Sequence, residues 1–321
     1  MARIIGFGQS PLTAQQRAAL GVELGAQGFE WMDFAVEGAD EARLAECEAL
    51  VGNFSQEQLQ RAEKLVWLQV APAGVERFVA PGALREDVIL TNGSGAYGIA
   101  IAEYMLGGLL MLMRRMATYL DNQRLHKWVQ FPGIRTLYGS KVTVVGAGNL
   151  GQSFAVRCSA MGAKVTGVRR AHPEAIPDGF SAMFSTDQLD EAIADADVVA
   201  LCLPATAQTV GLFDGARLSK MKRGAMIINV GRGSALDASA LIEALASGQL
   251  GGALLDVTDP EPLPENHPLW DAPNLILTPH ISGIDRDRLA AGMVYEIIRE
   301  NLLNYAQGLP LRNIVDRGRG Y

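Results

Sequence analysis

The second half of the chain alternates short apolar runs with segments of helical periodicity. Each run is followed by a polar or glycine-rich turn and then by a helical pattern, such as residues 186–194 or 238–247. The runs are apolar on both faces, as strands of a parallel sheet covered by helices must be. They lie at residues 142–145, 165–168, 198–203, 226–230, 253–257 and 275–277. The alternation predicts a doubly wound α/β sheet.

The first ninety residues repeat this style less regularly. Residues 4–7, 49–51, 66–70 and 88–90 look like strands, and residues 289–305 read as an amphipathic helix. A chain of 321 residues is about twice the usual domain size, so two domains are expected. We place the first at residues 1–93 and the second at residues 94–286.

Charge and cysteine content exclude several classes of function. The net charge of -7 argues against nucleic acid as a partner, because neutralising phosphates requires a basic face. Cys47, Cys158 and Cys202 are scattered and form no CxxC pair, so neither a zinc site nor a disulfide framework is expected. The N-terminus lacks the layout of a signal peptide. Together with the scattered cysteines, this indicates that the protein resides in a reducing cytoplasm.

One apolar stretch, residues 99–113, has the composition of a membrane segment. Glu103 interrupts it, which leaves only residues 104–113 without a charge, too few to cross a bilayer. We therefore expect no membrane association and interpret the stretch as a buried or dimer-facing helix.

A G-x-G-x-x-G turn directly follows the strand at 142–145. Between a strand and a helix, this spacing lets backbone amides approach a pyrophosphate at the helix N-terminus. Glycine-rich turns also occur without ligands, but the helix expected at 152–161 and the strand at 164–168 supply the required context. A second candidate, Gly6-Phe7-Gly8, lacks the third glycine, and Pro11 follows too early. Dinucleotide binding is therefore predicted at Gly146, Gly148, Asn149, Leu150 and Gly151.

The residues after the second strand of such a unit recognise the adenosine ribose. An acidic side chain there binds a free 2′-hydroxyl, whereas arginine pairs with a 2′-phosphate. Here Arg169 and Arg170 follow the strand, and no acid occurs before Glu174. The pair predicts NADP(H), with NAD(H) as the alternative if both arginines are merely solvated.

Chemically capable residues also follow the later strands, where ligands bind in open α/β sheets. Reduction of a ketone by a nicotinamide needs an acid for the developing alkoxide, and His280 suits this role. Glu261, in a proline-rich loop, could orient the imidazole and favour its protonated form, and Arg232 could grip a substrate carboxylate. His126, His172 and His267 read as surface residues, and no histidine pair has metal-ligand spacing, so no metal is expected.

These segments resemble the D-isomer-specific 2-hydroxyacid dehydrogenase family over nearly the whole chain. The resemblance rests on the glycine turn and on Asn229-Val230-Gly231-Arg232-Gly233, Leu255-Asp256-Val257, Asp259-Pro260-Glu261-Pro262-Leu263 and Thr278-Pro279-His280-Ile281-Ser282. It implies that Arg232 binds substrate and that Glu261 and His280 supply the proton. It places Asp256 at the cofactor end of the site and makes Leu203, Pro204 and Thr209 the wall beside the nicotinamide ribose. Further cofactor contacts are expected at Val230, Gly231, Ser282 and Gly283.

The resemblance extends to the first domain. Residues 71–75 resemble the family's loop whose backbone amides hold the substrate carboxylate, and we assign Ala73 and Gly74 to that role. The family more often has serine in place of Pro72, which here removes a hydroxyl and one backbone donor. Residues 91–98 resemble the hinge, and the terminal segment 287–321 is expected to return to the first domain. The arginine pair resembles the NADPH-preferring glyoxylate and hydroxypyruvate reductases of the family.

The expected protein is a cytoplasmic homodimer, paired through residues 99–113, that reduces a small 2-oxo acid to its D-2-hydroxy acid. Its fold is expected to consist of two Rossmann-like or flavodoxin-like domains with the active site in the cleft between them. One alternative is a phosphoglycerate dehydrogenase; another is a dinucleotide-sensing corepressor or binding protein on the same fold. Formate dehydrogenase is disfavoured, because its histidine partner is glutamine rather than the glutamate found at Glu261.

Overall fold

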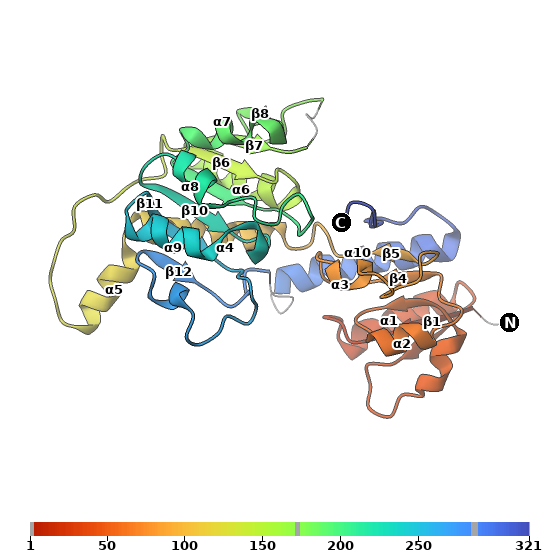
Figure 1. Ribbon diagram of the computed structural model, residues 1–321. Helices are drawn as coiled ribbons and strands as arrows, with labels where there is room; N and C mark the ends of the chain where they lie inside the picture. Colours follow the sequence, from red (N-terminus) through yellow and green to blue (C-terminus); the bar gives the residue numbers. More distant parts are fainter. Residues whose placement is uncertain (1–2, 171–173, 284–287, 321) are drawn as a thin grey trace. The chain divides into compact units, whose positions relative to one another are not determined.

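The structure is a computed structural model that describes residues 3–170, 174–283 and 288–320. The chain divides into two compact units: unit 1 contains residues 1–97 and 285–321, and unit 2 contains residues 98–284. Each unit is built on its own parallel sheet, which confirms the predicted α/β class (Figure 1). The domain boundary expected between residues 286 and 287 lies outside the described residues, and the one between 93 and 94 stays a prediction.

Unit 1 has a five-stranded parallel sheet in the order β2-β1-β3-β4-β5. The strands are β1 (Arg3–Phe7), β2 (Phe29–Asp33), β3 (Cys47–Val51), β4 (Trp67–Gln69) and β5 (Ile89–Thr91). The helices are α1 (Ala14–Gly25), α2 (Gln56–Arg61), α3 (Glu76–Val79) and α10 (Arg288–Gln307). Sequence analysis missed β2, an edge strand that carries Glu30 and Asp33 and is only partly buried.

Unit 1 takes its last helix from the far end of the chain. The side chain of Asn301 in α10 is fully buried and donates from Nδ2 to Oε1 of Gln69 in β4 at 2.7 Å. The ring of Tyr305 lies against that of Trp67, with 4.8 Å between ring centroids. These contacts tie α10 to β4 of the unit 1 sheet.

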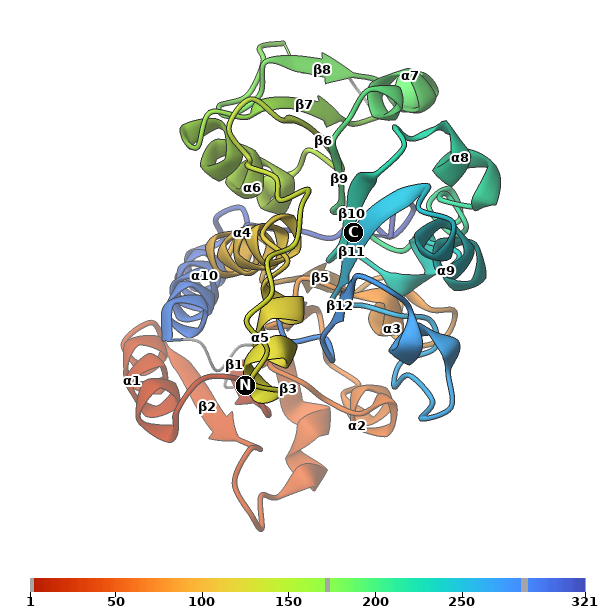
Figure 2. The same cartoon turned by 90° about the vertical axis from the view of Figure 1, so that its left-hand side faces the viewer.

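Unit 2 has a seven-stranded parallel sheet in the order β12-β11-β10-β9-β6-β7-β8, which Figure 2 shows from β8 to β12. The strands are β6 (Lys141–Val145), β7 (Lys164–Val168), β8 (Ala182–Phe184), β9 (Val198–Leu201), β10 (Ala225–Asn229), β11 (Leu250–Leu255) and β12 (Leu275–Leu277). The helices are α4 (Gly98–Met113), α5 (Met116–Arg124), α6 (Asn149–Ala160), α7 (Leu189–Ala194), α8 (Gly215–Lys220) and α9 (Ala238–Ala246). Sequence analysis missed β8, again a partly exposed edge strand.

Two hydrophobic clusters cover the two faces of the unit 2 sheet. One joins the strands to α4 and α6, and the other joins them to α7, α8 and α9. Strand order reverses at β6, which pairs with both β7 and β9. Ligands bind beyond the carboxyl ends of strands at such a switch point. Within the described part of the chain, no helix is long and apolar enough to cross a membrane.

Candidate active site

The glycine turn after β6 has the geometry that a pyrophosphate requires. Gly146 has φ of 101°, and a Cβ there would lie 2.4 Å from the carbonyl oxygen of Cys202. A Cβ on Gly151 would lie 2.3 Å from the carbonyl oxygen of Gly146, so both positions need glycine for steric reasons. Gly148, by contrast, faces open space and is the N-cap of α6 without a capping side chain. The first amides of α6, beginning at Asn149 and Leu150, have no acceptor within the helix and can therefore donate to a ligand.

The two predicted arginines follow β7, the neighbour of β6. The amide of Arg169 donates to the carbonyl of Phe184 in β8 at 3.1 Å, which fixes the backbone at this corner of the sheet. The side chains of Arg169 and Arg170 are both exposed. Glu174 is also exposed, and residues 171–173, which include His172, lie outside the described residues.

On the other side of β6, the loops after β9 and β10 pack backbone against backbone. A Cβ on Gly231 would lie 2.5 Å from the carbonyl oxygen of Leu203. The loop after Leu203 closes on itself, because Oγ1 of Thr209 donates to the carbonyl of Pro204 at 2.7 Å. The loops that hold Leu203 and Val230 are thereby brought together beyond the carboxyl ends of β9 and β10, and their role as a cofactor wall stays a prediction.

Arg232 is positioned by a side chain that sequence analysis did not assign to the site. Asn229, which ends β10 and is 1% exposed, accepts from the amide of Gly231 at 3.1 Å and donates to the carbonyl of Arg232 at 3.0 Å. Nη1 of Arg232 donates to the carbonyl of Gly231 at 2.8 Å. On the far side of the turn, a Cβ on Gly233 would lie 2.0 Å from the backbone of Thr258. A single polar residue that ends an apolar strand was the signal that could have identified Asn229.

The two residues of the predicted proton donor pair lie in contact. Nδ1 of His280 is 2.9 Å from Oε2 of Glu261, and both side chains remain partly exposed. The other carboxylate oxygen of Glu261 accepts from the amide of Thr258 at 2.9 Å, which fixes the carboxylate. Nδ1 therefore faces the carboxylate, and Nε2 is the ring nitrogen on the side away from it.

Asp256 holds the backbone that carries His280. It is 1% exposed, and its carboxylate accepts from the amides of Ile281 at 2.8 Å and Ser282 at 2.9 Å. Its carbonyl accepts from the amide of His280 at 2.8 Å. His280 has φ of 52°, a conformation that costs a non-glycine residue about 1–2 kcal/mol and persists only where neighbours enforce it. Gly283 follows Ser282 in the same turn.

The loop in unit 1 at residues 71–75 is held by its carbonyl groups. The carbonyl of Ala71 accepts from Oη of Tyr97 at 2.9 Å, that of Pro72 from the amide of Gly93 at 3.1 Å, and that of Ala73 from Nδ2 of Asn92 at 2.9 Å. Within the part of the chain that the structure describes, the amides of Ala73 and Gly74 donate to no acceptor. Both amides are thus available to an anion such as a carboxylate.

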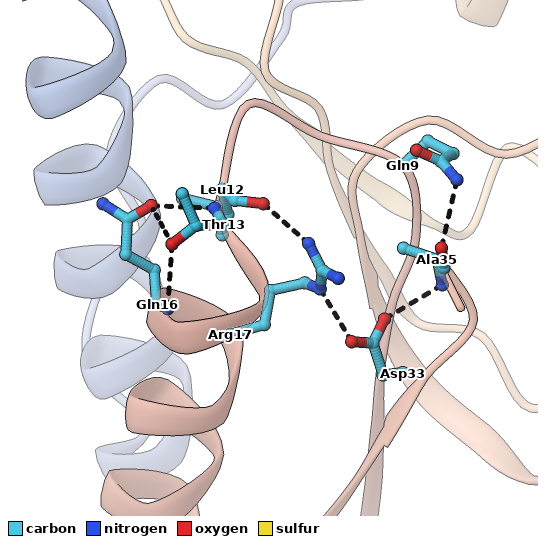
Figure 3. Close-up of polar contacts among 7 residues, drawn as sticks. All are labelled: Gln9, Leu12, Thr13, Gln16, Arg17, Asp33 and Ala35. Atoms are coloured by element: carbon cyan, nitrogen blue, oxygen red, sulfur yellow. Dashed lines mark hydrogen bonds and ion pairs between the residues drawn. The ribbon is translucent and has the colours of Figure 1, made fainter. Parts of the chain in front are cut away.

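The segment Gly6-Phe7-Gly8 at the end of β1 is followed by an acid, Asp33, whose surroundings differ from those of a ribose-binding residue. In unit 1, Asp33 ends β2, the position from which an acid would meet a ribose in a nucleotide-binding turn. Oδ2 of Asp33 is instead 2.9 Å from Nε of Arg17 in α1, and both side chains are largely buried (Figure 3). Nη1 of Arg17 also donates to the carbonyl of Leu12 at 2.6 Å. The carboxylate of Asp33 is therefore engaged in an ion pair with Arg17 within unit 1.

Comparison with known proteins decides the family. Residues 106–282 match the model of the D-isomer specific 2-hydroxyacid dehydrogenase NAD-binding domain, more than half of the chain. The chain belongs to this family. It is therefore an oxidoreductase that uses NAD(P), and its unit 2 contains the NAD-binding domain, which confirms the predicted resemblance.

Individual members of the family are similar over nearly their full length. The dehydrogenase is 30% identical to glyoxylate/hydroxypyruvate reductase B of Citrobacter koseri, over 85% of each chain. A family member from Aeromonas salmonicida subsp. salmonicida has a crystal structure that matches with a TM-score of 0.83 at 33% identity, covering 99% of this chain and all of that one. The NADPH-dependent glyoxylate/hydroxypyruvate reductase of Sinorhizobium meliloti, solved with NADP and sulfate, matches with a TM-score of 0.83 at 26% identity over the whole of both chains. The roles of individual site residues in this dehydrogenase stay predictions.

Proposed function

We propose that this dehydrogenase uses NADPH to reduce a small 2-oxo acid of the glyoxylate or hydroxypyruvate type to the D-2-hydroxy acid. The observation that carries the proposal is the contact between His280 and Glu261 at 2.9 Å, at the same edge of the sheet as the glycine turn. Arg232 follows β10, which lies between β12 and β6 in the sheet. An acid, its orienting carboxylate and a carboxylate-binding guanidinium are what this reduction requires.

The residues of unit 2 fit the cofactor. The open space at Gly148 and the uncapped start of α6 would receive the pyrophosphate, and the loops at Leu203, Pro204, Thr209, Val230 and Gly231 would line the nicotinamide side. The nicotinamide supplies the hydride that reduces the substrate carbonyl. Asp256 and the turn at Ser282 and Gly283 would complete this end of the site.

The protein's own groups supply binding and the proton. Arg232 pairs with the substrate carboxylate and polarises the adjacent carbonyl. The carboxylate-binding role of the Ala73 and Gly74 amides in unit 1 stays a prediction. Protonated His280 donates from Nε2 to the carbonyl oxygen as it becomes an alkoxide. Glu261 stabilises the imidazolium before the transfer and keeps Nε2 turned toward the substrate.

The direct test is turnover. NADPH and NADH oxidation would be followed with glyoxylate, hydroxypyruvate, pyruvate and phenylpyruvate, and the configuration of the product determined. We expect NADPH-dependent reduction of glyoxylate or hydroxypyruvate. Nucleotide binding without turnover of any of the four acids would instead indicate a dinucleotide-sensing binding protein.

The cofactor preference is expected to depend on Arg169. A 2′-phosphate adds negative charge where Arg169 and Arg170 stand, and charge-assisted hydrogen bonds contribute about 1.5–3 kcal/mol each. Arg169→Asp should therefore shift the ratio of kcat/KM for NADPH over NADH by at least about tenfold toward NADH. The matched control is Arg223→Asp, an exposed arginine before β10, which should leave the ratio unchanged. An unmodified enzyme that prefers NADH would show that Arg169 does not contact the cofactor.

Arg232 is expected to tolerate lysine poorly. Lysine keeps the charge but loses the planar fork that matches a carboxylate, so Arg232→Lys should lower kcat/KM for the 2-oxo acid by about 10–100-fold. The Kd for NADPH should change little. Wild-type kcat/KM in this variant would assign Arg232 to the structure of the turn between Gly231 and Gly233.

We further propose that the enzyme is a homodimer. The helix α4 buries one face in unit 2, while Leu106 and Leu110 are only partly buried and Met111 is exposed. The next helix, α5, buries no residue, and Trp128 after it is 98% exposed. Figure 1 shows α5 and the chain beyond it extending away from the unit 2 sheet. A second copy would cover these apolar side chains, so sedimentation velocity should give twice the mass of one chain.

A further inference from the structure

The helix α4 reaches the segment that carries His280 through one hydroxyl group. Oη of Tyr104 in α4 lies 2.5 Å from Oγ1 of Thr278, which follows β12 directly. Thr278 in turn donates from Oγ1 to Oδ1 of Asp256 at 2.6 Å. The three side chains form one hydrogen-bonded chain, which ends on the carboxylate that holds the amides of Ile281 and Ser282.

The direction of the hydrogen bonds in this chain follows from the donors available. A threonine hydroxyl has one hydrogen, and an ionised carboxylate can only accept. Because Thr278 gives its hydrogen to Asp256, Tyr104 must donate to Thr278. Burial raises the pKa of Tyr104 to about 12, so its hydroxyl keeps that hydrogen at neutral pH.

Close packing of α4 on β11 permits this contact. Gly108 lies one turn after Tyr104 in α4, and a Cβ there would lie 2.5 Å from Cδ2 of Leu254 in β11. The absence of a side chain at Gly108 lets the helix approach the strand whose end carries Asp256. Tyr104 is half-buried at this crossing.

We propose that Tyr104 is a positioning residue for His280, acting through Thr278 and Asp256. Asp256 can fix His280 in its left-handed conformation only if its own carboxylate stays in place. Its Oδ1 is shared between Thr278 and the amide of Ile281. Hydrogen bonds in such a chain strengthen one another, so removing the Tyr104 donor weakens the hold of Thr278 on Asp256. The inference rests on the proposed role of His280 as the proton donor.

The test is a double-mutant cycle in the full-length enzyme. Tyr104→Phe should lower kcat for the 2-oxo acid about three- to tenfold, which corresponds to one net hydrogen bond. KM and the Kd for NADPH should stay within about twofold, because Tyr104 is not among the residues proposed to contact either ligand. Thr278→Ser keeps the hydroxyl and should retain wild-type kcat. Thr278→Val removes the hydroxyl and should lower kcat at least as much as Tyr104→Phe does. The double variant Tyr104→Phe/Thr278→Val should match Thr278→Val alone, because Tyr104 acts only through Thr278.

Tyr138→Phe is the matched control, since Tyr138 is in the same unit and is 77% exposed. Wild-type kcat in Tyr104→Phe, an equal loss in Tyr138→Phe, or losses that multiply in the double variant would overturn the inference.

Hydrogen exchange separates this inference from the proposed function. The amides of His280, Ile281 and Ser282 all donate to Asp256, so Tyr104→Phe should speed exchange in a peptide spanning residues 278–283 while the rest of unit 2 keeps its protection. This readout does not need turnover. If the wild-type enzyme reduced no 2-oxo acid, the proposed function would fail, yet faster exchange would still support the link from Tyr104 to the His280 segment. Unchanged exchange would refute that link.

Discussion

Replacing His280 with alanine is expected to lower kcat for 2-oxo acid reduction by about 10²–10⁴-fold, the usual contribution of a positioned general acid. The variant loses the group proposed to protonate the alkoxide, and no other histidine lies in contact with Glu261 among the described residues. The glycine turn proposed to bind the nucleotide belongs to β6 and α6, so the Kd for NADPH should change little. Steady-state kinetics and a fluorescence titration with NADPH measure the two quantities.

A second histidine provides the control for this prediction. His126 is exposed and has φ of 53°, a conformation that asparagine tolerates, so His126→Asn should retain wild-type kcat. A His280→Ala enzyme with more than about a tenth of wild-type kcat would remove His280 from the proton transfer, since a general acid contributes at least 10²-fold.

Asp33→Ala is expected to lower the free energy of unfolding of unit 1 by about 3–5 kcal/mol. The side chains of Arg17 and Asp33 are only 9% and 15% exposed, so the substitution leaves a buried guanidinium without its counter-ion. The amide of Ala35 also loses its acceptor, Oδ1 of Asp33. Urea unfolding monitored by tryptophan fluorescence reports the loss, because Trp31 lies beside Phe7 in the same unit.

An exposed ion pair in unit 1 provides the control for the loss of stability in Asp33→Ala. Nε of Arg85 lies 3.1 Å from Oδ1 of Asp87, and the two side chains are 44% and 69% exposed. Asp87→Ala should therefore lower the free energy of unfolding by less than about 1 kcal/mol. Replacing both Arg17 and Asp33 by apolar residues should recover most of the stability lost in Asp33→Ala. Equal losses in Asp33→Ala and Asp87→Ala would show that the buried pair contributes no more than a surface pair.

The sequence predicts best what depends on local sterics. The strands of the unit 2 interior were found because they are apolar on both faces. Of the two that were missed, β2 carries Glu30 and Asp33, and β8 is only three residues long. The glycine turn after β6 was also predictable, because its spacing follows from close backbone approaches at Gly146 and Gly151.

Contacts between distant segments were predicted where reaction chemistry demanded them or where the family resemblance implied them. The pairing of Glu261 with His280 followed from the need for an oriented acid. Tyr104 and Thr278 are 174 positions apart, and their contact depends on where α4 crosses β11, which periodicity does not reveal. Asn229 was missed for a different reason, since its contacts are local and its role lies in folding a turn rather than in contact with a ligand.

The division of unit 1 between the two ends of the chain constrains the order in which the protein folds during synthesis. Residues 3–97 leave the ribosome first but lack α10, which supplies the buried side chains of Ile298, Asn301 and Leu302. Unit 2 is continuous in sequence and has all of its strands by residue 277. During synthesis, unit 2 should therefore be able to fold before α10 has been made. At that stage Trp67 still lacks its contact with Tyr305, and Gln69 lacks its hydrogen bond to Asn301.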